Sequence, residues 1–305
     1  MQLVRVAFSK KGITVMVDIM FDAEKCIQCG ACVAACPAAV FAQEQKRVPE
    51  VVQEALCIAC GHCVAVCPVD AVAHSAFPEG TVISVASDLM PSAEQTLELL
   101  RSRRSVRVFK DTPVSPEELE QILAAARLAP TGHNVQDVRF VVVQDKALLA
   151  TITKIVVKYF LGVAKQIRNP LVRSLYRLVL TKSEIDGITQ MLPDFNAIKQ
   201  GYSEGQDPIL RGANCLILAH SPRTVNFPET NAALALHNAA LLAHSMNIGS
   251  FITGYVVGAC KRNRKILDLL EIPKGHEVYA GLAVGYPDVT YQKWIQRRAA
   301  DVVWK

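Results

Sequence analysis

Helical patterns of polar and apolar residues begin at two positions between residues 90 and 120. Ser115 is followed three positions later by Glu118, which is the pattern of a capping box at the start of a helix. Apolar residues then recur with a helical period through 116–129, and Pro130 ends the pattern. The same type of start occurs at Ser92. We therefore expect one amphipathic helix to begin at each of these two serines.

Short apolar runs between the helical stretches have the length of strands. They lie at 138–144, 215–220 and 277–287. Each run predicts a buried strand, and the third closes with Gly-Tyr-Pro. Helices with such strands interspersed predict an α+β fold built around a central sheet.

The stretch 231–260 contains no Asp, Glu, Lys or Arg. This composition predicts a helix that is buried all round, in the core or at a subunit interface. A membrane span is the alternative. Five polar residues interrupt the apolar run, and the segment 249–259 has the character of a strand or a loop, so the buried helix is favoured. The five are Asn231, His237, Asn238, His244 and Asn247.

The stretch 146–182 has the opposite character, with eight bases and no acid. A solvated face on one or two helices explains this pattern, and so does docking of an acidic partner or of an anionic membrane surface. The sequence leaves these alternatives open. The bases are Lys146, Lys154, Lys158, Lys165, Arg168, Arg173, Arg177 and Lys182.

Composition and charge narrow the class of protein. The chain has 305 residues, of which 51% are hydrophobic and 20% charged, so it is globular and long enough for two domains. Residues 20–80 carry three bases and seven acids, which is a charge of −4. Because the net charge of the chain is +5, the other residues together carry +9. The basic excess is neither rich in arginine nor interleaved with aromatics, and we expect no nucleic-acid binding. The charged segment "MQLVRVAFSKKG" is no signal peptide, which favours a cytoplasmic protein.

A cysteine motif occurs twice, as "CIQCGACVAACP" at 26–37 and, 31 positions later, as "CIACGHCVAVCP" at 57–68. Eight of the ten cysteines fall in these two segments. In a chain without an export signal this favours metal ligation over structural disulfides. A zinc site and a set of redox disulfides are the alternatives. Cys215 and Cys260 stand in apolar runs and are expected to be plain buried cysteines.

The doubled motif resembles a bacterial ferredoxin domain with two [4Fe–4S] clusters, in which the fourth cysteine of each motif ligates the other cluster. The resemblance covers about 20–78, and it implies two sets of ligands. The first set is Cys26, Cys29, Cys32 and Cys67, and the second is Cys57, Cys60, Cys63 and Cys36. We expect the ferredoxin-type domain at 1–80, a linker at 81–91 and a second domain at 92–305.

The second domain resembles the nitroreductase family of flavoproteins. The resemblance lies in "RRSVRVFKDTPV" (103–114), "LAPTGHNVQDVRFVVV" (128–143), "PILRGANCLIL" (208–218), "GSFITGY" (249–255) and "VGYP…RR" (284–298), in that order. It implies an α+β sandwich with a mainly antiparallel central sheet, an FMN cofactor and an intertwined homodimer with FMN at the interface.

The resemblance also implies a set of residues around FMN. Arg103 and Ser105 would meet the phosphate, and Arg107 would reach the N1/O2 edge of the flavin, where a cation stabilises the reduced form. Backbone N–H groups at 252–254 would face N5, and the loop 130–134 would come from the partner subunit. The full set is Arg103, Arg104, Ser105, Arg107, Pro130, Thr131, Gly132, Asn134, Ile252, Thr253, Gly254, Arg297 and Arg298.

Two positions depart from the family's pattern, and the role of a third is open. Many family members carry an acidic residue where Thr253 stands, and a proline is common where Asn214 follows "GA". His133 lies in the flavin loop, where a structural role and a role in proton transfer both remain open. The sequence therefore assigns no catalytic residue.

These features predict an FMN-dependent oxidoreductase. Two [4Fe–4S] clusters would pass single electrons from an external low-potential donor (ferredoxin, flavodoxin or NAD(P)H) to FMN. FMN would then reduce a small electron acceptor, such as a nitroaromatic, a quinone or an activated alkene. In one alternative, NAD(P)H reduces FMN and the clusters carry electrons to a protein partner. In another, the chain is a redox sensor or electron-transfer adaptor without turnover.

Overall fold

The computed structural model describes residues 6–9, 12–15, 17–176 and 181–305, with the backbone alone for the first two segments. Arg177, one of the bases noted above, lies outside the described residues. The chain divides into two compact units. The first comprises 1–90 with 133–135, and the second comprises 91–132 with 136–305. Each is described by itself.

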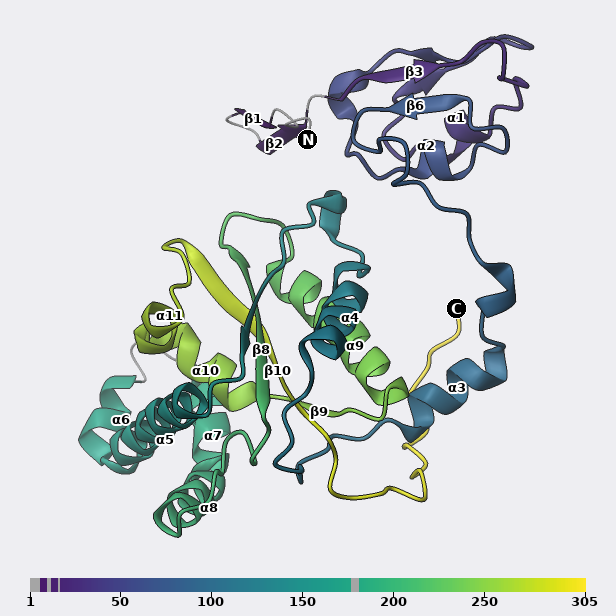
Figure 1. The fold of residues 1–305 in the computed structure, drawn as a ribbon. Helices are drawn as coiled ribbons and strands as arrows, with labels where there is room; N and C mark the ends of the chain where they lie inside the picture. The colour runs from purple at the N-terminus through teal and green to yellow at the C-terminus, as the bar shows by residue number, and fades with distance from the viewer. Residues whose placement is uncertain (1–5, 10–11, 16, 177–180) are drawn as a thin grey trace. The chain divides into compact units, whose positions relative to one another are not determined.

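The first unit consists of short elements around a small core (Figure 1). Its strands form antiparallel pairs, β1 with β2, β3 with β6 and β4 with β5. Two single-turn helices begin after Gly30 and Gly61, whose φ values of 73° and 76° are readily adopted only by glycine. The bounds are β1 Val6–Ser9, β2 Gly12–Val15, β3 Ile19–Phe21, α1 Ala31–Ala35, β4 Phe41–Ala42, β5 Glu50–Val51, η1 Glu54–Leu56, α2 His62–Ala65, β6 Val72–His74 and η2 Ser87–Leu89.

The second unit is built on a sheet whose strand order, in the described residues, is β7-β8-β10-β9, with every neighbouring pair antiparallel. The strands are β7 Arg139–Val143, β8 Cys215–Pro222, β9 Gly249–Ile252 and β10 His276–Gly285. Successive residues of β8 alternate between two cores, with Leu216 and Leu218 in one and Ile217 and Ala219 in the other. This confirms the predicted α+β fold with an antiparallel central sheet.

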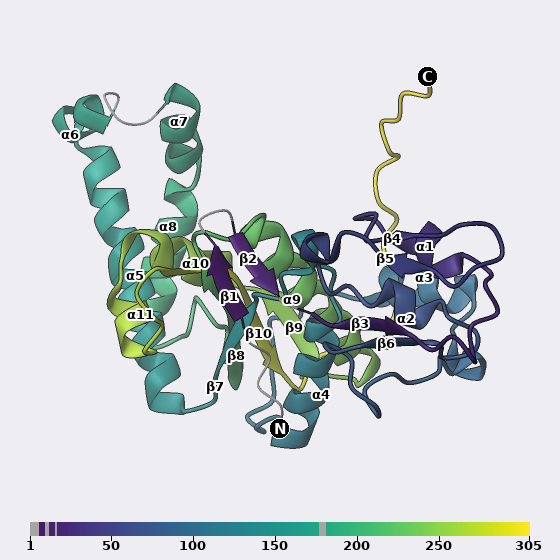
Figure 2. The same ribbon diagram turned by 90° about the horizontal axis from the view of Figure 1, so that it is seen from above.

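Helices cover both faces of this sheet (Figures 1 and 2). Buried residues of α4 and α9 form one core with it, and those of α5, α8, α10 and α11 form the other. Alanines recur on the buried face of α9 and allow α4 to pack closely against it. The helices are α3 Ala93–Ser102, α4 Pro116–Arg127, η3 Gly132–Asn134, α5 Lys146–Arg168, α6 Pro170–Tyr176, α7 Lys182–Gln190, α8 Leu192–Ser203, α9 Pro228–Ser245, α10 Gly254–Arg262 and α11 Lys265–Leu269.

Both predicted helix starts are confirmed. Ser92 and Ser115 each accept a hydrogen bond from the backbone N–H three residues later, and the side chains of Gln95 and Glu118 bond back to the N-cap N–H groups. Tyr286 donates to the same Glu118 carboxylate, so this capping box also ties α4 to the chain that follows β10.

The prediction of one buried helix over 231–260 is only partly right. Helix α9 ends at Ser245, and β9 and α10 follow it. One face of α9 is buried, whereas Ala233, Leu234 and His237 are exposed in the single chain. The expected strand lies at 249–252, but 254–262 is helical.

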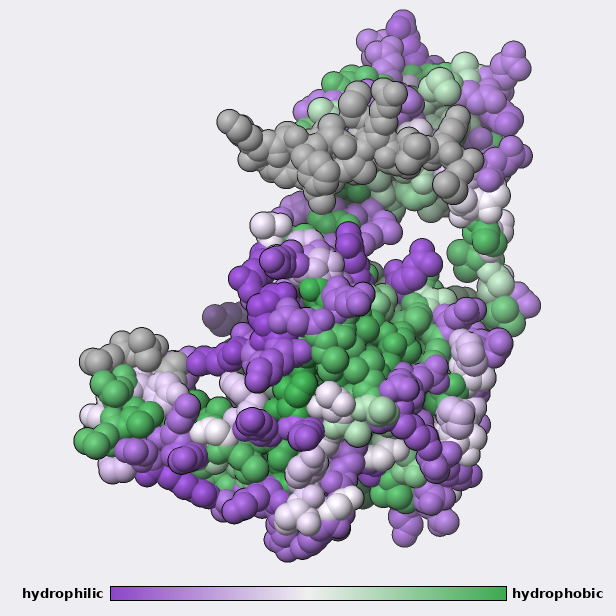
Figure 3. Space-filling model, turned by 60° about the vertical axis from the view of Figure 1, so that its left-hand side comes forward, coloured by the Kyte–Doolittle hydropathy of each residue, from purple (hydrophilic) through white to green (hydrophobic). Residues whose placement is uncertain are grey.

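Five of the eight bases of the basic stretch lie on the long amphipathic helix α5, whereas Arg173 lies on α6 and Lys182 on α7. Helix α5 is long and apolar enough to cross a membrane by length and composition. Its apolar face, however, packs in the core through residues such as Ile152 and Val156, while its lysines are exposed. At the end of α5, helix α6 exposes 78% of Leu171 and 63% of Leu175. Figure 3 shows hydrophobic patches among hydrophilic residues on one face of the chain.

Candidate functional site

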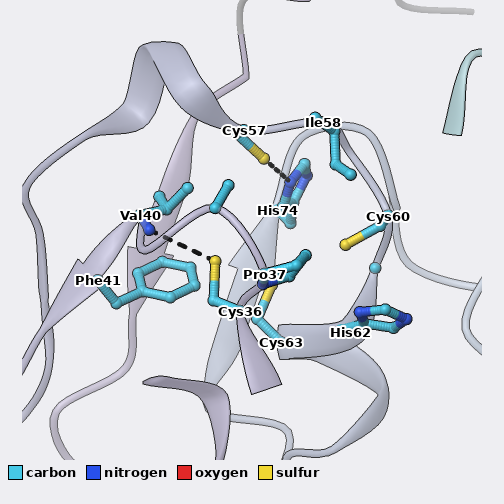
Figure 4. A pocket seen from close by; sticks show the side chains of 12 residues that line it. Cys36, Pro37, Val40, Phe41, Cys57, Ile58, Cys60, His62, Cys63 and His74 are labelled. Carbon is cyan, nitrogen blue, oxygen red and sulfur yellow. Dashed lines mark hydrogen bonds between the residues drawn. The ribbon is translucent and has the colours of Figure 1, made fainter. Parts of the chain in front are cut away.

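The fold brings the eight motif cysteines together as two groups of four. Cys36 joins the three cysteines of the second motif around one cavity (Figure 4). Cys67 joins those of the first motif around another. The fourth cysteine of each motif thus lies with the other motif, which is the grouping that the resemblance to ferredoxins implies. The groups are Cys36, Cys57, Cys60 and Cys63, and Cys26, Cys29, Cys32 and Cys67.

The backbone around the cysteines turns tightly and donates hydrogen bonds to their sulfur atoms. Residues two after the first cysteine of each motif, Gln28 and Ala59, have φ values of 61° and 48°, which turn the chain tightly. Backbone N–H groups point at ligand sulfurs, from Val40 to Cys36 at 3.4 Å and from Ala71 to Cys67 at 3.2 Å. Such N–H···S bonds stabilise negative charge on thiolates and on cluster sulfur.

The cysteine groups fit a cluster better than a single zinc ion. Zinc needs four ligands at about 2.3 Å from one point, whereas these cysteines surround a cavity. Burial raises the pKa of Cys63 to about 11 and also raises that of Cys32. Burial thus disfavours the thiolate form in these largely apolar cavities, and a bound cationic core would favour it.

The predicted arginine segment lies along the edge of the sheet of the second unit. Ser105 forms a parallel bridge with Ser250 of β9, and the N–H of Val106 donates to the Ser250 oxygen at 3.0 Å. Any side chain at Gly249 would collide with Val106, so glycine is required for this close approach. The guanidinium of Arg107 then lies 5.7 Å from the ring centre of Phe251.

An arginine-lined cavity of about 390 Å³ lies beside this segment. Arg103 and Arg104 line it together with Arg101 and, from the chain after β10, Trp294 and Arg297. The structure thus brings three of the predicted phosphate-binding arginines together. Arg298 is exposed and does not line this cavity, and neither do Ser105 and Arg107.

Two residues that the sequence did not single out hold this arginine segment in place. Ser102, the last residue of α3, lies 2.9 Å from Nε2 of His244 on α9. Burial lowers the pKa of His244, and the nearby Arg103 lowers it further. The neutral ring thus fixes the end of α3 just before Arg103 without competing for an anion. A contact so distant in sequence leaves no local pattern.

The flavin loop is anchored by another residue without a predicted role. Asn231 is 2% exposed, and its side chain accepts from the N–H of Gly132 at 3.1 Å and donates to Asp137 at 3.1 Å. A Cβ at Gly132 would collide with Phe227. Thr131 lines a cavity of about 180 Å³ with other residues of the second unit, apart from the arginine cavity, and Pro130 is exposed.

The tip of this loop has an unusual backbone. His133 and Asn134 have φ values of 55° and 53°, and the segment clusters with the first unit. Within that unit the amide of Asn134 donates to the carbonyl oxygens of Ile58 at 3.2 Å and Ala59 at 2.7 Å. Its role at a flavin therefore remains a prediction.

The junction of β9 and α10 has one open side. Ile252 is 58% exposed, and nothing lies within 4 Å of where a Cβ of Gly254 would be. The N–H of Thr253, however, donates to the Gly281 oxygen at 2.8 Å, so it is not available to face a flavin N5. The Thr253 side chain is buried against Gly281, which explains why this position has no part in the exposed face.

Asn214 has a structural role. Its amide donates to the carbonyl oxygens of Lys110 at 2.7 Å and Thr112 at 2.9 Å. These bonds hold the chain that follows the arginine segment, and a proline could not form them. The departure from the family's pattern therefore has a local explanation.

Replacing Asn231 with alanine is expected to lower the free energy of unfolding by about 1–3 kcal/mol, because buried partners lose their hydrogen bonds. Asn231 bonds Gly132 and Asp137 from a fully buried position. Chemical denaturation measures the change. Asn238→Ala is the control on the same helix, since Asn238 makes one bond of 3.4 Å. Equal stability of the two variants would contradict the anchoring role.

Known proteins match both parts of the chain. Residues 100–286 match the nitroreductase family, and residues 18–69 match a 4Fe-4S dicluster domain. An FMN reductase [NAD(P)H] of Bacillus subtilis (strain 168) is 28% identical over 193 residues, which are 63% of this chain and 66% of the relative.

Solved structures show the same fold as the second unit. An FMN-bound nitroreductase of Bacteroides fragilis has a TM-score of 0.51 at 20% identity and covers 69% of this chain and 99% of its own. An FMN-bound nitroreductase of Desulfitobacterium hafniense has a TM-score of 0.52 at 23% identity, and the match covers 68% of this chain and 98% of that protein. The family match spans more than half of the sequence. The chain therefore belongs to the nitroreductase family and carries a 4Fe-4S dicluster domain ahead of its nitroreductase domain.

Proposed function

We propose that this protein is an FMN-dependent oxidoreductase in which iron–sulfur clusters exchange electrons with FMN, and FMN reduces a small acceptor. The observation that carries the proposal is the grouping of the eight cysteines as four and four in a chain that also has a nitroreductase domain. The clusters would move electrons one at a time. FMN would accept them singly and release two as a hydride equivalent from N5.

The arginine cavity is suited to the phosphate of FMN. Arg103, Arg104 and Arg297 converge on it from two segments, and guanidinium groups bind phosphate through paired hydrogen bonds. Arg107 lies on the edge of the sheet beside β9, where its positive charge would favour the reduced, anionic ring. The exposed apolar side chain of Ile252 and the open side of Gly254 would leave room for the ring.

The acceptor would be a nitroaromatic, a quinone or an activated alkene that stacks on the flavin. A homodimer would place the 130–134 loop of one subunit at the flavin of the other. After its first turn, which carries the exposed Glu229, the exposed part of α9 at Ala233, Leu234 and His237 supports such an interface, since it contains no Asp, Glu, Lys or Arg that would have to be desolvated.

A second candidate function reverses the electron flow. The similarity to an FMN reductase [NAD(P)H] favours NAD(P)H as the reductant of FMN, with the clusters delivering electrons to a protein partner. A redox sensor without turnover is the alternative outside enzymes.

Anaerobic stopped-flow absorbance separates these functions. The flavin of the intact protein and that of a Cys29→Ala/Cys60→Ala variant without clusters are each mixed with reduced ferredoxin and with NAD(P)H. Our proposal predicts that ferredoxin bleaches the flavin only when the clusters are present. Bleaching of the cluster-free variant by NAD(P)H would favour the second function. Absence of turnover with a nitroaromatic, a quinone and an activated alkene would favour a sensor.

A further inference from the structure

A buried histidine contacts one ligand sulfur of the second cysteine group. His74, the last residue of β6, is 5% exposed, and its Nε2 lies 3.5 Å from Sγ of Cys57 (Figure 4). The ring also packs against Phe77, with 4.9 Å between ring centres. The imidazole is thus held in one orientation toward the sulfur.

The hydrogen bonds of the ring decide which nitrogen carries its proton. Nδ1 of His74 lies 3.1 Å from the backbone nitrogen of Ala76, whose N–H can only donate. Nδ1 therefore presents a lone pair, and the proton of the ring is on Nε2. The contact with Cys57 is then an N–H···S hydrogen bond that points at the thiolate.

The other half of the repeat has no such donor. With the 31-residue offset of the motifs, Gln43 corresponds to His74 and Cys26 to Cys57. The Gln43 amide donates instead to the carbonyl oxygens of Gln28 at 3.2 Å and Arg47 at 2.8 Å. In the part of the chain that the structure describes, no side-chain hydrogen bond reaches a cysteine of the first group.

The lining of the cavity at Cys57 is also more polar than that of the cavity at Cys26. Both groups receive an equivalent backbone bond, from Val40 to Cys36 and from Ala71 to Cys67, and Cys57 accepts a further one from the N–H of Ala59 at 3.4 Å. Apart from its cysteines, the cavity at Cys26 is lined by apolar residues such as Phe21, Ile27 and Val69. The cavity at Cys57 is lined by His74 and His62 as well. The repeat therefore places two chemically different environments around two otherwise similar ligand sets.

We propose that His74 makes the cluster at Cys57 the more easily reduced of the two. This inference rests on the proposed function, because it requires that both clusters are present. Reduction adds one electron to a cluster and breaks no bond. A fixed N–H on a ligand sulfur stabilises the added negative charge and raises the reduction potential. The electron then settles on the Cys57 cluster, which orders the transfer from the Cys26 cluster toward it.

A redox titration followed by EPR spectroscopy tests this on the reconstituted full chain. The unaltered protein is expected to show two potentials. His74→Phe is expected to reduce the equilibrium constant for reduction of the Cys57 cluster about tenfold, which lowers the higher of the two potentials by about 59 mV for one electron. Gln43→Leu, the matched change in the other half, is expected to leave the difference between the potentials in place. His74→Gln, which returns an N–H near the position of Nε2, is expected to restore part of the shift.

A second measurement needs no substitution at His74. In protein with ¹⁵N-labelled histidine, pulsed EPR of the reduced Cys57 cluster is expected to show a coupled nitrogen that persists in His62→Leu. Two equal potentials in the unaltered protein, or no coupled nitrogen, would overturn the inference alone. Absence of any cluster signal, with no bound iron, would instead overturn the proposed function on which it rests.

Discussion

Replacing Cys36 with alanine is expected to remove the cluster at Cys57, Cys60 and Cys63, although Cys36 belongs to the first motif in sequence. The structure places Cys36 in the cavity of the second motif. A substitution in the first motif is therefore expected to remove the cluster of the second. Roughly half of the iron should be lost, since each cluster holds four iron atoms. Iron analysis and EPR of anaerobically reconstituted protein measure the effect.

The reciprocal variant sharpens this test. Cys67→Ala should remove the cluster at Cys26, Cys29 and Cys32 and leave the other. Cys260→Ala is the control, because Cys260 is buried in the core of the second unit and lines neither cavity. If Cys36→Ala removed the cluster at Cys26 instead, the crossed ligand sets would be wrong.

Replacing Arg103 with alanine is expected to weaken FMN binding by about ten- to a hundredfold. Arg103 lines the arginine cavity, and a hydrogen bond to a charged group contributes about 1.5–3 kcal/mol. Quenching of FMN fluorescence on titration of flavin-free protein gives the dissociation constant.

Arg264→Ala serves as the control for this variant. Arg264 is half-exposed on the surface, where it pairs only with Asp268 of the next helical turn at 3.4 Å. Such a pair adds little to stability, so FMN affinity should not change. Equal dissociation constants for Arg103→Ala and the unaltered protein would remove Arg103 from the flavin site.

Local patterns made much of this fold predictable. The capping boxes at Ser92 and Ser115 and the three apolar strands depend on residues within a few positions of one another. The spacing of the cysteines also carries its own geometry, since three ligands in seven residues already define one side of a cluster. Such features are visible in one sequence because the chain builds them locally.

Other features depend on contacts that the sequence does not display. The segment 254–262 is helical although its apolar run and glycines resemble a strand or loop, because α10 packs on the sheet through Val256 and Ala259. Asn231 and His74 act through partners brought near by the tertiary fold. A single asparagine or histidine in an apolar run gives no signal of such a role.

The central claim is that iron–sulfur clusters and a flavin serve one electron path in a single chain. The most direct measurement is the content of iron, acid-labile sulfide and FMN in protein purified without oxygen. We expect about eight iron and eight sulfide per chain, from two four-iron clusters, together with about one FMN. Zinc in place of iron, or a colourless protein that binds no added FMN, would contradict it.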